Sequence, residues 1–251
     1  RIRVCRIVAA SSGALNGTVF AAGIRARAES AAASRLSRAW MQHGGLAQIL
    51  SPNLRAIASR RGFSDQKKLL ALLRTHAPAN RNPEPAPVEL HLVVGALHGA
   101  TARIGGAPAT SYTNVQSFQD EDFDSPERIA AVHRAATASA AFPLLFAPVD
   151  LPGIGPCVDG GLVNNTPVLT ALGPDHGAAL DAIVVVAPTP ALAWPPRKPY
   201  RGFELGSQVF DMLFSEWLFQ DLRRAARVAE RRGALARRRD LTPAQIAAAT
   251  E

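Results

Sequence analysis

Two short segments of the sequence contain residue types that could carry out acyl-transfer chemistry. The segment Ala9–Gly13 reads Ala-Ala-Ser-Ser-Gly, so that small residues surround the hydroxyl of Ser11. The segment Cys157–Gly161 reads Cys-Val-Asp-Gly-Gly, so that two glycines directly follow the carboxylate of Asp159. A serine hydroxyl becomes a nucleophile when a base lies within hydrogen-bond reach, and a carboxylate can be that base. The two segments predict a hydrolytic site if the fold brings them together.

Ser11 lies between a strand-like stretch and a helix-like stretch. Residues 1–8 alternate charged and apolar side chains, which is typical of a strand, and the Ala-rich residues after Ser12 predict a helix. A strand, a sharp turn and a helix form the nucleophile elbow of serine hydrolases, usually written Gly-x-Ser-x-Gly. Here Ala9 replaces the first glycine and Gly13 is the second. A plain N-cap, at Ser11 or at Ser12, remains the alternative.

Asp159 has a similar pair of interpretations. Glycine accepts positive φ and allows a second backbone to approach, so the carboxylate could end a strand and point into a confined space. Asp-Gly between apolar runs is also a strong hairpin signal. The stretch by itself favours a turn, whereas its combination with Ser11 favours a base.

Helix and strand signals alternate along the chain and predict an α/β architecture. Apolar runs predict buried or half-buried strands at residues 88–98, 111–118 and 182–187. Ser64 is predicted to cap a helix over residues 65–74, and Ser125 to cap a helix that runs to about residue 141. Residues 29–62 are predicted to be helix ends and loop.

Composition argues against several other kinds of protein. No apolar run is long enough to cross a bilayer, because proline, glycine or charge interrupts each one. Cys5 and Cys157 are too few for a disulfide framework, and their apolar surroundings favour buried thiols. The acidic cluster Asp120–Asp124 lacks the central glycine and terminal glutamate of a Ca²⁺ loop. We therefore expect a solvated loop there, no metal site and no cofactor.

The charge of the chain suggests an acidic partner. The formal net charge is +8, and arginines gather in the far part of a stretch with helical spacing, residues 203–239. A solvated basic face is the simplest interpretation, and contact with acidic headgroups is the more specific one. No nucleic-acid module accompanies the arginines, so we favour membrane over nucleic-acid contact. We expect a cytoplasmic protein that can contact an acidic membrane surface peripherally.

Three motifs in this order resemble those of the patatin-like phospholipase family. They are the serine segment Ala9–Gly17, the Ala-Ser-x-x-x-Pro-x-x-Phe segment Ala138–Phe146, and the aspartate segment Asp159–Pro167. The resemblance covers roughly residues 1–188. It implies a three-layer α/β sandwich with a mostly parallel central sheet flanked by helices. It also predicts an acyl hydrolase domain over residues 1–202, followed by a basic amphipathic helical segment over residues 203–251.

The resemblance implies a serine acyl hydrolase that cleaves lipid or other carboxylic esters with a Ser-Asp dyad and no histidine. Ser11 would attack the ester carbonyl, and Asp159 would act as the general base. Ser12 and Gly13 would form the elbow and its oxyanion donor. Two further glycines, Gly160 and Gly161, would support the turn after Asp159. Among the six histidines, His98 at the end of a predicted strand is the one that could complete a triad.

The family also has a Gly-rich oxyanion loop upstream of its serine, and no such loop precedes Ser11. Loss of one oxyanion donor costs on the order of 2.7–4 kcal/mol of transition-state stabilisation. Because the chain begins with Arg1, we expect an N-terminally truncated member, with a divergent member as the other reading. The alternative function is a catalytically impaired remnant that binds lipid or a protein partner through its basic C-terminal helix.

Overall fold

The computed structural model describes most of the first 172 residues and shorter stretches beyond them. The described residues are 2–43, 46–50, 52, 62–80, 82, 84–104, 106–172, 180–186, 212, 216, 220, 222–228, 230 and 231. The chain divides into two compact units, Arg1–Asn164 and Asn165–Glu251. Among the described residues, no helix is long and apolar enough to span a membrane.

Strand β2 (Glu89–Ile104) is the centre of the sheet in the first unit. Along one edge it pairs with the antiparallel strand β3 (Ala107–Phe118). Two short strands share its other edge: the parallel strand β1 (Arg6–Ala9) and the antiparallel strand β5 (Gly155–Asp159). Strand β4 (Val149–Leu151) extends the sheet by pairing with β5. β2 is therefore the strand that all the others except β4 contact directly.

The predicted α/β class, with a central sheet flanked by helices, is confirmed, but the described strand pairs are not mostly parallel. Only β1 and β2 run parallel, whereas β2–β3, β2–β5 and β4–β5 are antiparallel. Two of the antiparallel pairs, β2–β3 and β4–β5, are joined by connections of two or three residues. Connections this short close hairpins and cannot make the crossover that a parallel pair needs.

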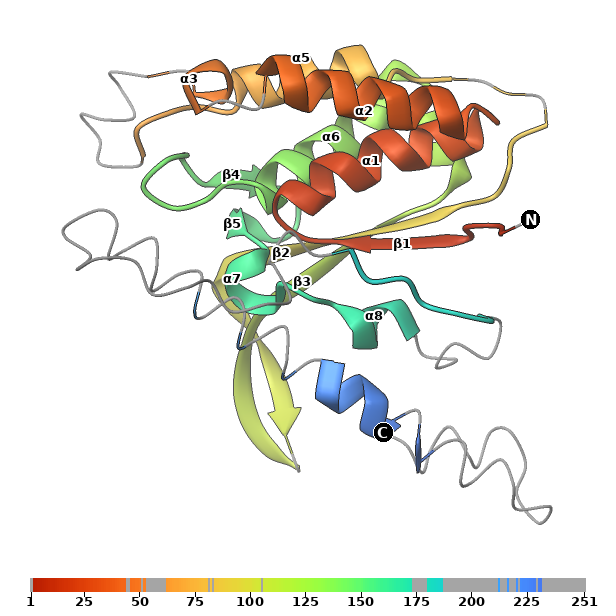
Figure 1. Ribbon diagram of the computed structural model, residues 1–251. Helices are drawn as coiled ribbons and strands as arrows, with labels where there is room; N and C mark the ends of the chain where they lie inside the picture. The colour runs from red at the N-terminus through yellow and green to blue at the C-terminus, as the bar shows by residue number, and fades with distance from the viewer. Residues whose placement is uncertain are drawn as a thin grey trace, which may run out of the picture. The chain divides into compact units, whose positions relative to one another are not determined.

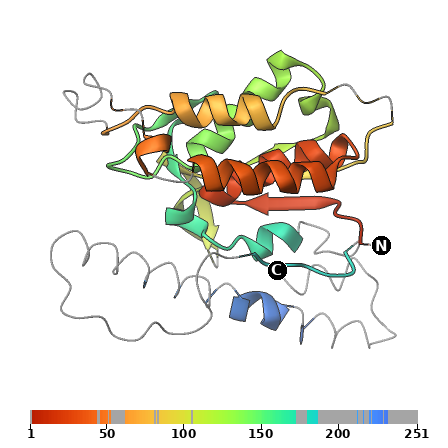
Figure 2. The same ribbon diagram turned by 45° about the horizontal axis from the view of Figure 1, so that its top comes forward.

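Helices cover one face of this sheet in two tiers (Figure 1). Helix α1 (Ser12–Arg25) and helix α6 (Pro126–Ser139) contact the strands directly. Helix α2 (Glu29–His43) and helix α5 (Lys67–His76) pack mainly on these two helices. Figure 2 shows α2 and α5 running alongside one another in the outer tier. The remaining short helices are α3 (Leu46–Ile49), η1 (Asp120–Phe123), α7 (Gly161–Asn164) and, in the second unit, α8 (Val168–Leu172).

Small residues allow α1 to fit between the sheet and α2. A Cβ atom added at Gly17 would lie 3.1 Å from Ile7 Cγ2 of β1. A Cβ atom added at Gly23 would lie only 2.2 Å from Ala32 Cβ of α2. The helix is therefore held close to both neighbours, and only Ala10 and Ser11 separate its first residue from the end of β1.

Helix α2 corrects the prediction of helix ends and loop over residues 29–62. Its amphipathic stripe, Ala32, Leu36, Ala39 and Trp40, has the spacing of one helix face. Serines, arginines and other polar residues around the stripe lower the mean hydropathy of the helix, so the sequence pattern did not indicate it. The stripe faces α1 and the cavity described below, and Ala32 and Ala39 are buried.

The two predicted helix caps have different outcomes. Ser125 caps α6 as predicted, because its side chain accepts a hydrogen bond of 3.3 Å from the Arg128 N–H. Ser64 does not cap α5, because the helix begins at Lys67 and Gln66 stands at its N-cap position. Ser64 is buried instead, and its backbone forms a bridge with Phe146. The bridge to Phe146, a contact with a distant segment, thus holds Ser64 in place of the predicted capping role.

The strand predicted over residues 182–187 is wrong for the part that the structure describes. Residues 182–186 have no regular secondary structure, and none of the described strands pairs with them. β-branched residues favour an extended chain, but a strand also needs a neighbour for its backbone groups. The helix predicted over residues 203–239 is described only in part, and residues 222–228 within it are helical.

The contact between Gly23 and Ala32 leads to a first prediction. Gly23→Ala should lower the free energy of unfolding by about 1–3 kcal/mol, because the new methyl group overpacks the contact between α1 and α2. The matched control is Gly13→Ala in the same helix, whose Cβ would meet only Ala9 Cβ at 4.0 Å. The control should leave the stability unchanged or slightly higher. Equal urea denaturation midpoints for the two variants would contradict the close helix packing.

Candidate active site

Ser11 lies on a sharp turn between β1 and α1. Its backbone has φ 55° and ψ −134°, in a region that residues other than glycine rarely adopt. Its side chain makes no capping hydrogen bond to α1, so Ser11 stands at the N-cap position without performing that role. Strain of this kind is typical of a nucleophile elbow, in which the hydroxyl is turned away from the helix.

The hydroxyl of Ser11 is hydrogen-bonded to Asp159. Ser11 Oγ donates to Asp159 Oδ2 at 2.7 Å. The other carboxylate oxygen, Oδ1, accepts the backbone N–H of Gly161 at 2.7 Å. The Asp159 side chain is almost completely buried. The predicted pair is thus in direct contact, and both oxygens of the carboxylate have a donor.

The sheet explains why residues 148 positions apart meet. β1 and β5 pair with the same edge of β2 and approach each other along it (Figure 1). β1 ends with Ala9 opposite Leu92, and β5 ends with Asp159 opposite Val94. Only Val93 of β2 separates these two positions. Residues that leave the ends of β1 and β5 must therefore meet beside Val93.

Ser139, at the end of α6, joins the three chain segments at this point. Its Oγ donates to the Val93 carbonyl at 2.6 Å and accepts the Ser11 N–H at 3.0 Å. Its own carbonyl accepts the Gly160 N–H at 3.0 Å. The Ser139 side chain is fully buried. The sequence marked the segment Ala138–Phe146 but gave this serine no role, because its partners come from distant segments.

The predicted glycines differ in what the site requires of them. A Cβ atom at Gly160 would lie 2.0 Å from the Val93 carbonyl oxygen, so only glycine fits there. Gly161 begins α7 and contributes its N–H to Asp159. Gly13 lies in the first turn of α1, where a Cβ would have room. Space therefore explains Gly160 but not Gly13.

Burial controls the acidity of Asp159. Removal from water raises the pKa of its carboxyl to about 6, although the hydrogen bonds from Ser11 and Gly161 act in the opposite direction. Near neutral pH the carboxylate is therefore ionised in most molecules, yet it is far more basic than an exposed aspartate. A base with a pKa close to the working pH transfers protons efficiently.

A cavity of about 180 Å³ opens beside Ser11 and Asp159. The first turns of α1 contribute Ser12 and Asn16, and Asn16 Oδ1 accepts a hydrogen bond of 2.7 Å from Trp40 Nε1. The other walls are apolar side chains from α1, α2, α3, α5 and the segment after α6: Leu15, Leu36, Ala39, Trp40, Ile49, Leu69, Leu72, Ala140, Phe142, Leu145 and Phe146. Ser11 and Asp159 thus face a space with mostly apolar walls, which suits a hydrocarbon chain.

No histidine among the described residues lines this cavity. His98 lies beside Gly155, at the opposite end of β5 from Asp159, where a Cβ on Gly155 would be 3.1 Å from the His98 ring. His133 is buried with its Nε2 at 2.9 Å from the Ala77 carbonyl, and burial lowers its pKa. The fold therefore does not bring His98 to Ser11 as a third member of the site.

The acidic cluster Asp120–Asp124 forms the helix η1 in place of the expected loop. The Asp122 carboxylate accepts a hydrogen bond of 2.8 Å from the Gln119 N–H and so caps this turn. Within the described ranges, no three His, Cys, Asp or Glu side chains are grouped as metal ligands would be.

The position of Ser139 leads to a second prediction. Ser139→Ala should lower the free energy of unfolding by about 2–4 kcal/mol, because it leaves the buried Val93 carbonyl and Ser11 N–H without partners. Ser125→Ala, which removes only the cap of the same helix, should cost about 1 kcal/mol. Chemical denaturation of both variants measures the difference. A smaller loss for Ser139→Ala than for Ser125→Ala would contradict the stabilising role of the two Ser139 Oγ hydrogen bonds.

The raised pKa of Asp159 leads to a third prediction. Because the folded-state pKa lies above the unfolded value, this group's contribution to stability is complete below the unfolded pKa and is lost as pH rises through about 6. Asp159→Asn should therefore be more stable than wild type at pH 7.5, by up to about 3 kcal/mol. The advantage should shrink as pH falls toward 4. A difference that does not change over this interval would show that Asp159 titrates normally.

A comparison with protein-family models supports the same interpretation of the chain. A model described as patatin-like phospholipase matches residues 1–172, which include Ser11, Ser139 and Asp159. Neither a search of curated proteins nor a search of solved structures gives a match. The predicted domain boundary at residue 202 lies beyond the family match, in a stretch outside the described residues, and it stays a prediction. Since the match covers well over half of the 251 residues, the chain belongs to the patatin-like phospholipase family, whose members are lipase- and phospholipase-type acyl hydrolases.

Proposed function

We propose that this protein hydrolyses carboxylic esters of lipids through a dyad of Ser11 and Asp159. The observation that carries the proposal is the 2.7 Å hydrogen bond from Ser11 Oγ to a buried carboxylate beside an apolar cavity. A nucleophile in contact with its base, next to a space for the substrate, satisfies the geometric requirements of covalent acyl transfer.

In the first step, Ser11 Oγ attacks the ester carbonyl while its proton passes to Asp159 Oδ2. The C–O bond to the leaving alcohol then breaks, and Asp159 returns the proton to the alcohol oxygen. In the second step, Asp159 removes a proton from water, which attacks the acyl-serine. The acid leaves, and Ser11 regains its proton. A single carboxylate thus serves as base and acid in both halves of the reaction.

The start of α1 supplies a donor for the oxyanion that forms during each attack. The N–H of Ser12 belongs to the first turn of the helix, where backbone N–H groups have no acceptor within the helix. The positive end of the helix dipole lies at the same place. The N–H of Ser11 itself is already bonded to Ser139. Ser12 is therefore the donor we assign, with Gly13 following it in the elbow.

The pKa of Asp159 supports its assignment as the base. An exposed aspartate is too weak a base to accept a serine proton efficiently, whereas burial raises the pKa of Asp159 to about 6. The dyad consequently needs no histidine to reach a useful basicity at neutral pH.

The walls of the cavity support a lipid ester as the substrate class. Leu36, Leu69 and Phe146 are representative of walls that offer hydrocarbon contact and few polar groups. Burial of each methylene of an acyl chain against such walls contributes about 0.8 kcal/mol. A charged or strongly hydrated acyl group would lose its water without finding partners.

A fluorophosphonate probe tests the dyad and gives a fourth prediction. Wild type should be labelled on Ser11, and Ser11→Ala should not be labelled. Asp159→Asn should be labelled at least 100-fold more slowly, since general base catalysis contributes about 10²–10⁴-fold. The matched control is Ser12→Ala, which keeps the backbone N–H and removes a hydroxyl that has no assigned role.

The pH dependence of labelling adds a second readout to this experiment. Only ionised Asp159 can accept the proton, so the wild-type labelling rate should rise with pH through about 6 and level off above it. Equal labelling of wild type and Ser11→Ala would overturn the assignment of the nucleophile. A folded wild-type protein that is neither labelled nor active on p-nitrophenyl esters would favour the non-catalytic alternative.

That alternative is supported by the arginines of the second unit. Residues 222–228 are helical, and the side chains of Arg223, Arg224 and Arg227 are exposed. A basic helix face of this kind can contact acidic headgroups. We propose peripheral contact with acidic membranes as a secondary property of the chain, whether or not the dyad is active.

A further inference from the structure

Three large, solvent-exposed apolar side chains lie on segments that line the cavity or are hydrogen-bonded to such a segment, and we call them the apolar rim. They are Trp40 of α2, which is 41% exposed, Phe63, which is 44% exposed, and Leu144, which is 82% exposed. Single exposed apolar residues are common on protein surfaces. The rim differs because its members are linked to each other or to the cavity by contacts in the structure.

Backbone hydrogen bonds hold Phe63 and Leu144 next to each other. The Phe63 N–H donates to the Leu144 carbonyl at 3.0 Å, and the Ser64 N–H donates to the Leu145 carbonyl at 2.8 Å. On either side of Leu144, Phe142 and Leu145 line the cavity. The segment thus directs these neighbours into the cavity and leaves Leu144 outside it.

Leu144 has two unfavourable features at this position. Its backbone φ is 72°, in the left-handed region where leucine is unfavourable and Asn or Gly is common. Its side chain is also largely in water. Backbone strain concentrates at functional sites, and here it coincides with an exposed hydrocarbon side chain beside the candidate active site.

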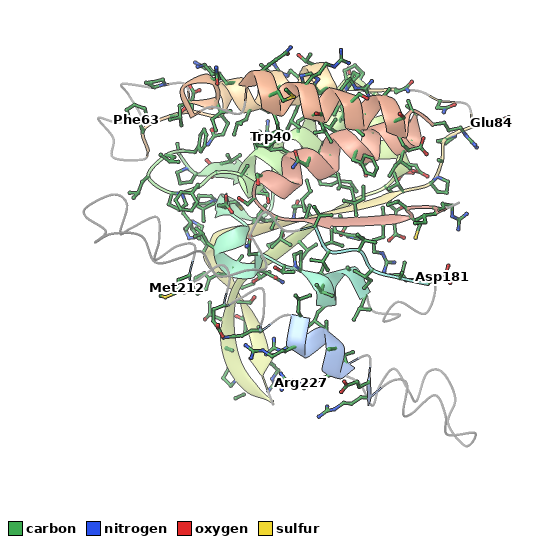
Figure 3. All side chains as sticks on the ribbon, in the orientation of Figure 1. Trp40, Phe63, Glu84, Asp181, Met212 and Arg227 are labelled. Atoms are coloured by element: carbon green, nitrogen blue, oxygen red, sulfur yellow. The ribbon has the colours of Figure 1, made fainter. Side chains whose placement is uncertain are left out.

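Trp40 links the rim to the cavity wall. Its indole lines the cavity, and its Nε1 donates to Asn16 Oδ1 at 2.7 Å. Figure 3 shows Trp40 and Phe63 on the helix-covered side of the sheet. Aromatic rings with a polar atom already satisfied suit the boundary between water and lipid.

We propose that the apolar rim docks on the surface of a phospholipid aggregate and places the mouth of the cavity against it. The inference rests on the proposed function, because a lipid ester would then pass from the aggregate to Ser11 without crossing water. The rim contains no charged side chain, so the attraction is hydrophobic and works on a zwitterionic surface. This separates it from contact through the basic second unit, which requires acidic headgroups.

Vesicle binding tests the proposal directly and gives a fifth prediction. The protein carries Ser11→Ala, so that no lipid is hydrolysed, and is sedimented with phosphatidylcholine vesicles. Leu144→Asn should reduce the partition coefficient on the order of tenfold, and Leu144→Asn with Phe63→Ser should reduce it further. Asn tolerates positive φ, so the first variant should fold normally. Neither residue lines the cavity.

The matched control is Leu97→Asn, which changes another exposed leucine, 48% exposed, on β2. Its partition should stay within about twofold of the parent protein. Urea denaturation of every variant shows that each is folded at the assay temperature. A parent protein that does not bind phosphatidylcholine vesicles, or a double variant that binds as well as the parent, would overturn the proposal. So would binding that needs acidic lipid and disappears at high salt.

A second readout locates the contact. The sequence contains three tryptophans, Trp40, Trp194 and Trp217. With Trp194→Phe and Trp217→Phe, emission reports Trp40 alone and should shift to shorter wavelength when phosphatidylcholine vesicles are added. No shift while the protein sediments with the vesicles would place the contact elsewhere and reject the rim.

Failure of the rim can be distinguished from failure of the dyad. With Ser11 restored, hydrolysis of water-soluble p-nitrophenyl butyrate measures the site without a lipid surface. Hydrolysis together with rim-independent vesicle binding would reject the rim alone. Rim-dependent binding of a protein that cannot hydrolyse the soluble ester would reject the dyad and retain the docking surface.

Discussion

The gap between β1 and β5 on one edge of β2 is the constraint on which the site depends. Only Val93 separates the pairing positions of Ala9 and Asp159, so the turn after β1 and the turn after β5 must share a small space. Ser139 occupies that space and bonds the Val93 carbonyl and the Ser11 N–H with one hydroxyl. Position 160 requires glycine, because any side chain there would collide with the Val93 carbonyl. The contact between Ser11 and Asp159 follows from this arrangement of backbone.

The same arrangement makes the site costly for the fold. A carboxylate is buried, its pKa is raised to about 6 by that burial, and Ser11 has a strained backbone. Such costs are common where activity requires a basic carboxylate or an exposed nucleophile. The hydrogen bonds from Ser11 and Gly161 recover part of the lost solvation without removing the basicity. Stability and proton-transfer ability therefore oppose each other at Asp159.

The helical tiers give the site its apolar surroundings. α1 fits tightly against β1 through Gly17 and against α2 through Gly23. Trp40, at the other end of the α2 stripe from Ala32, then lies beside Asn16 near the start of α1. The segment after α6 closes the other side. The two residues of the proposed dyad and the walls of the cavity thus come from different layers: the sheet edge brings Ser11 and Asp159 together, and the helices provide most of the walls.

Local patterns and short motifs in the sequence were enough to predict the α/β class and the capped start of α6. They were also enough to select Ser11, Asp159 and the two glycines after the aspartate as candidate site residues. The sequence did not reveal α2, because polar residues surround its apolar stripe. It also predicted a strand over residues 182–186, which are mostly β-branched but do not pair with any described strand. Four features became visible only in the folded chain: the mixed sheet, the hydrogen bonds of Ser139, the raised pKa of the buried Asp159 carboxyl, and the position of His98 away from Ser11. Each depends on which distant segments share an edge of β2, and pairing across such distances is set by the packing of the whole unit rather than by any one stretch of sequence.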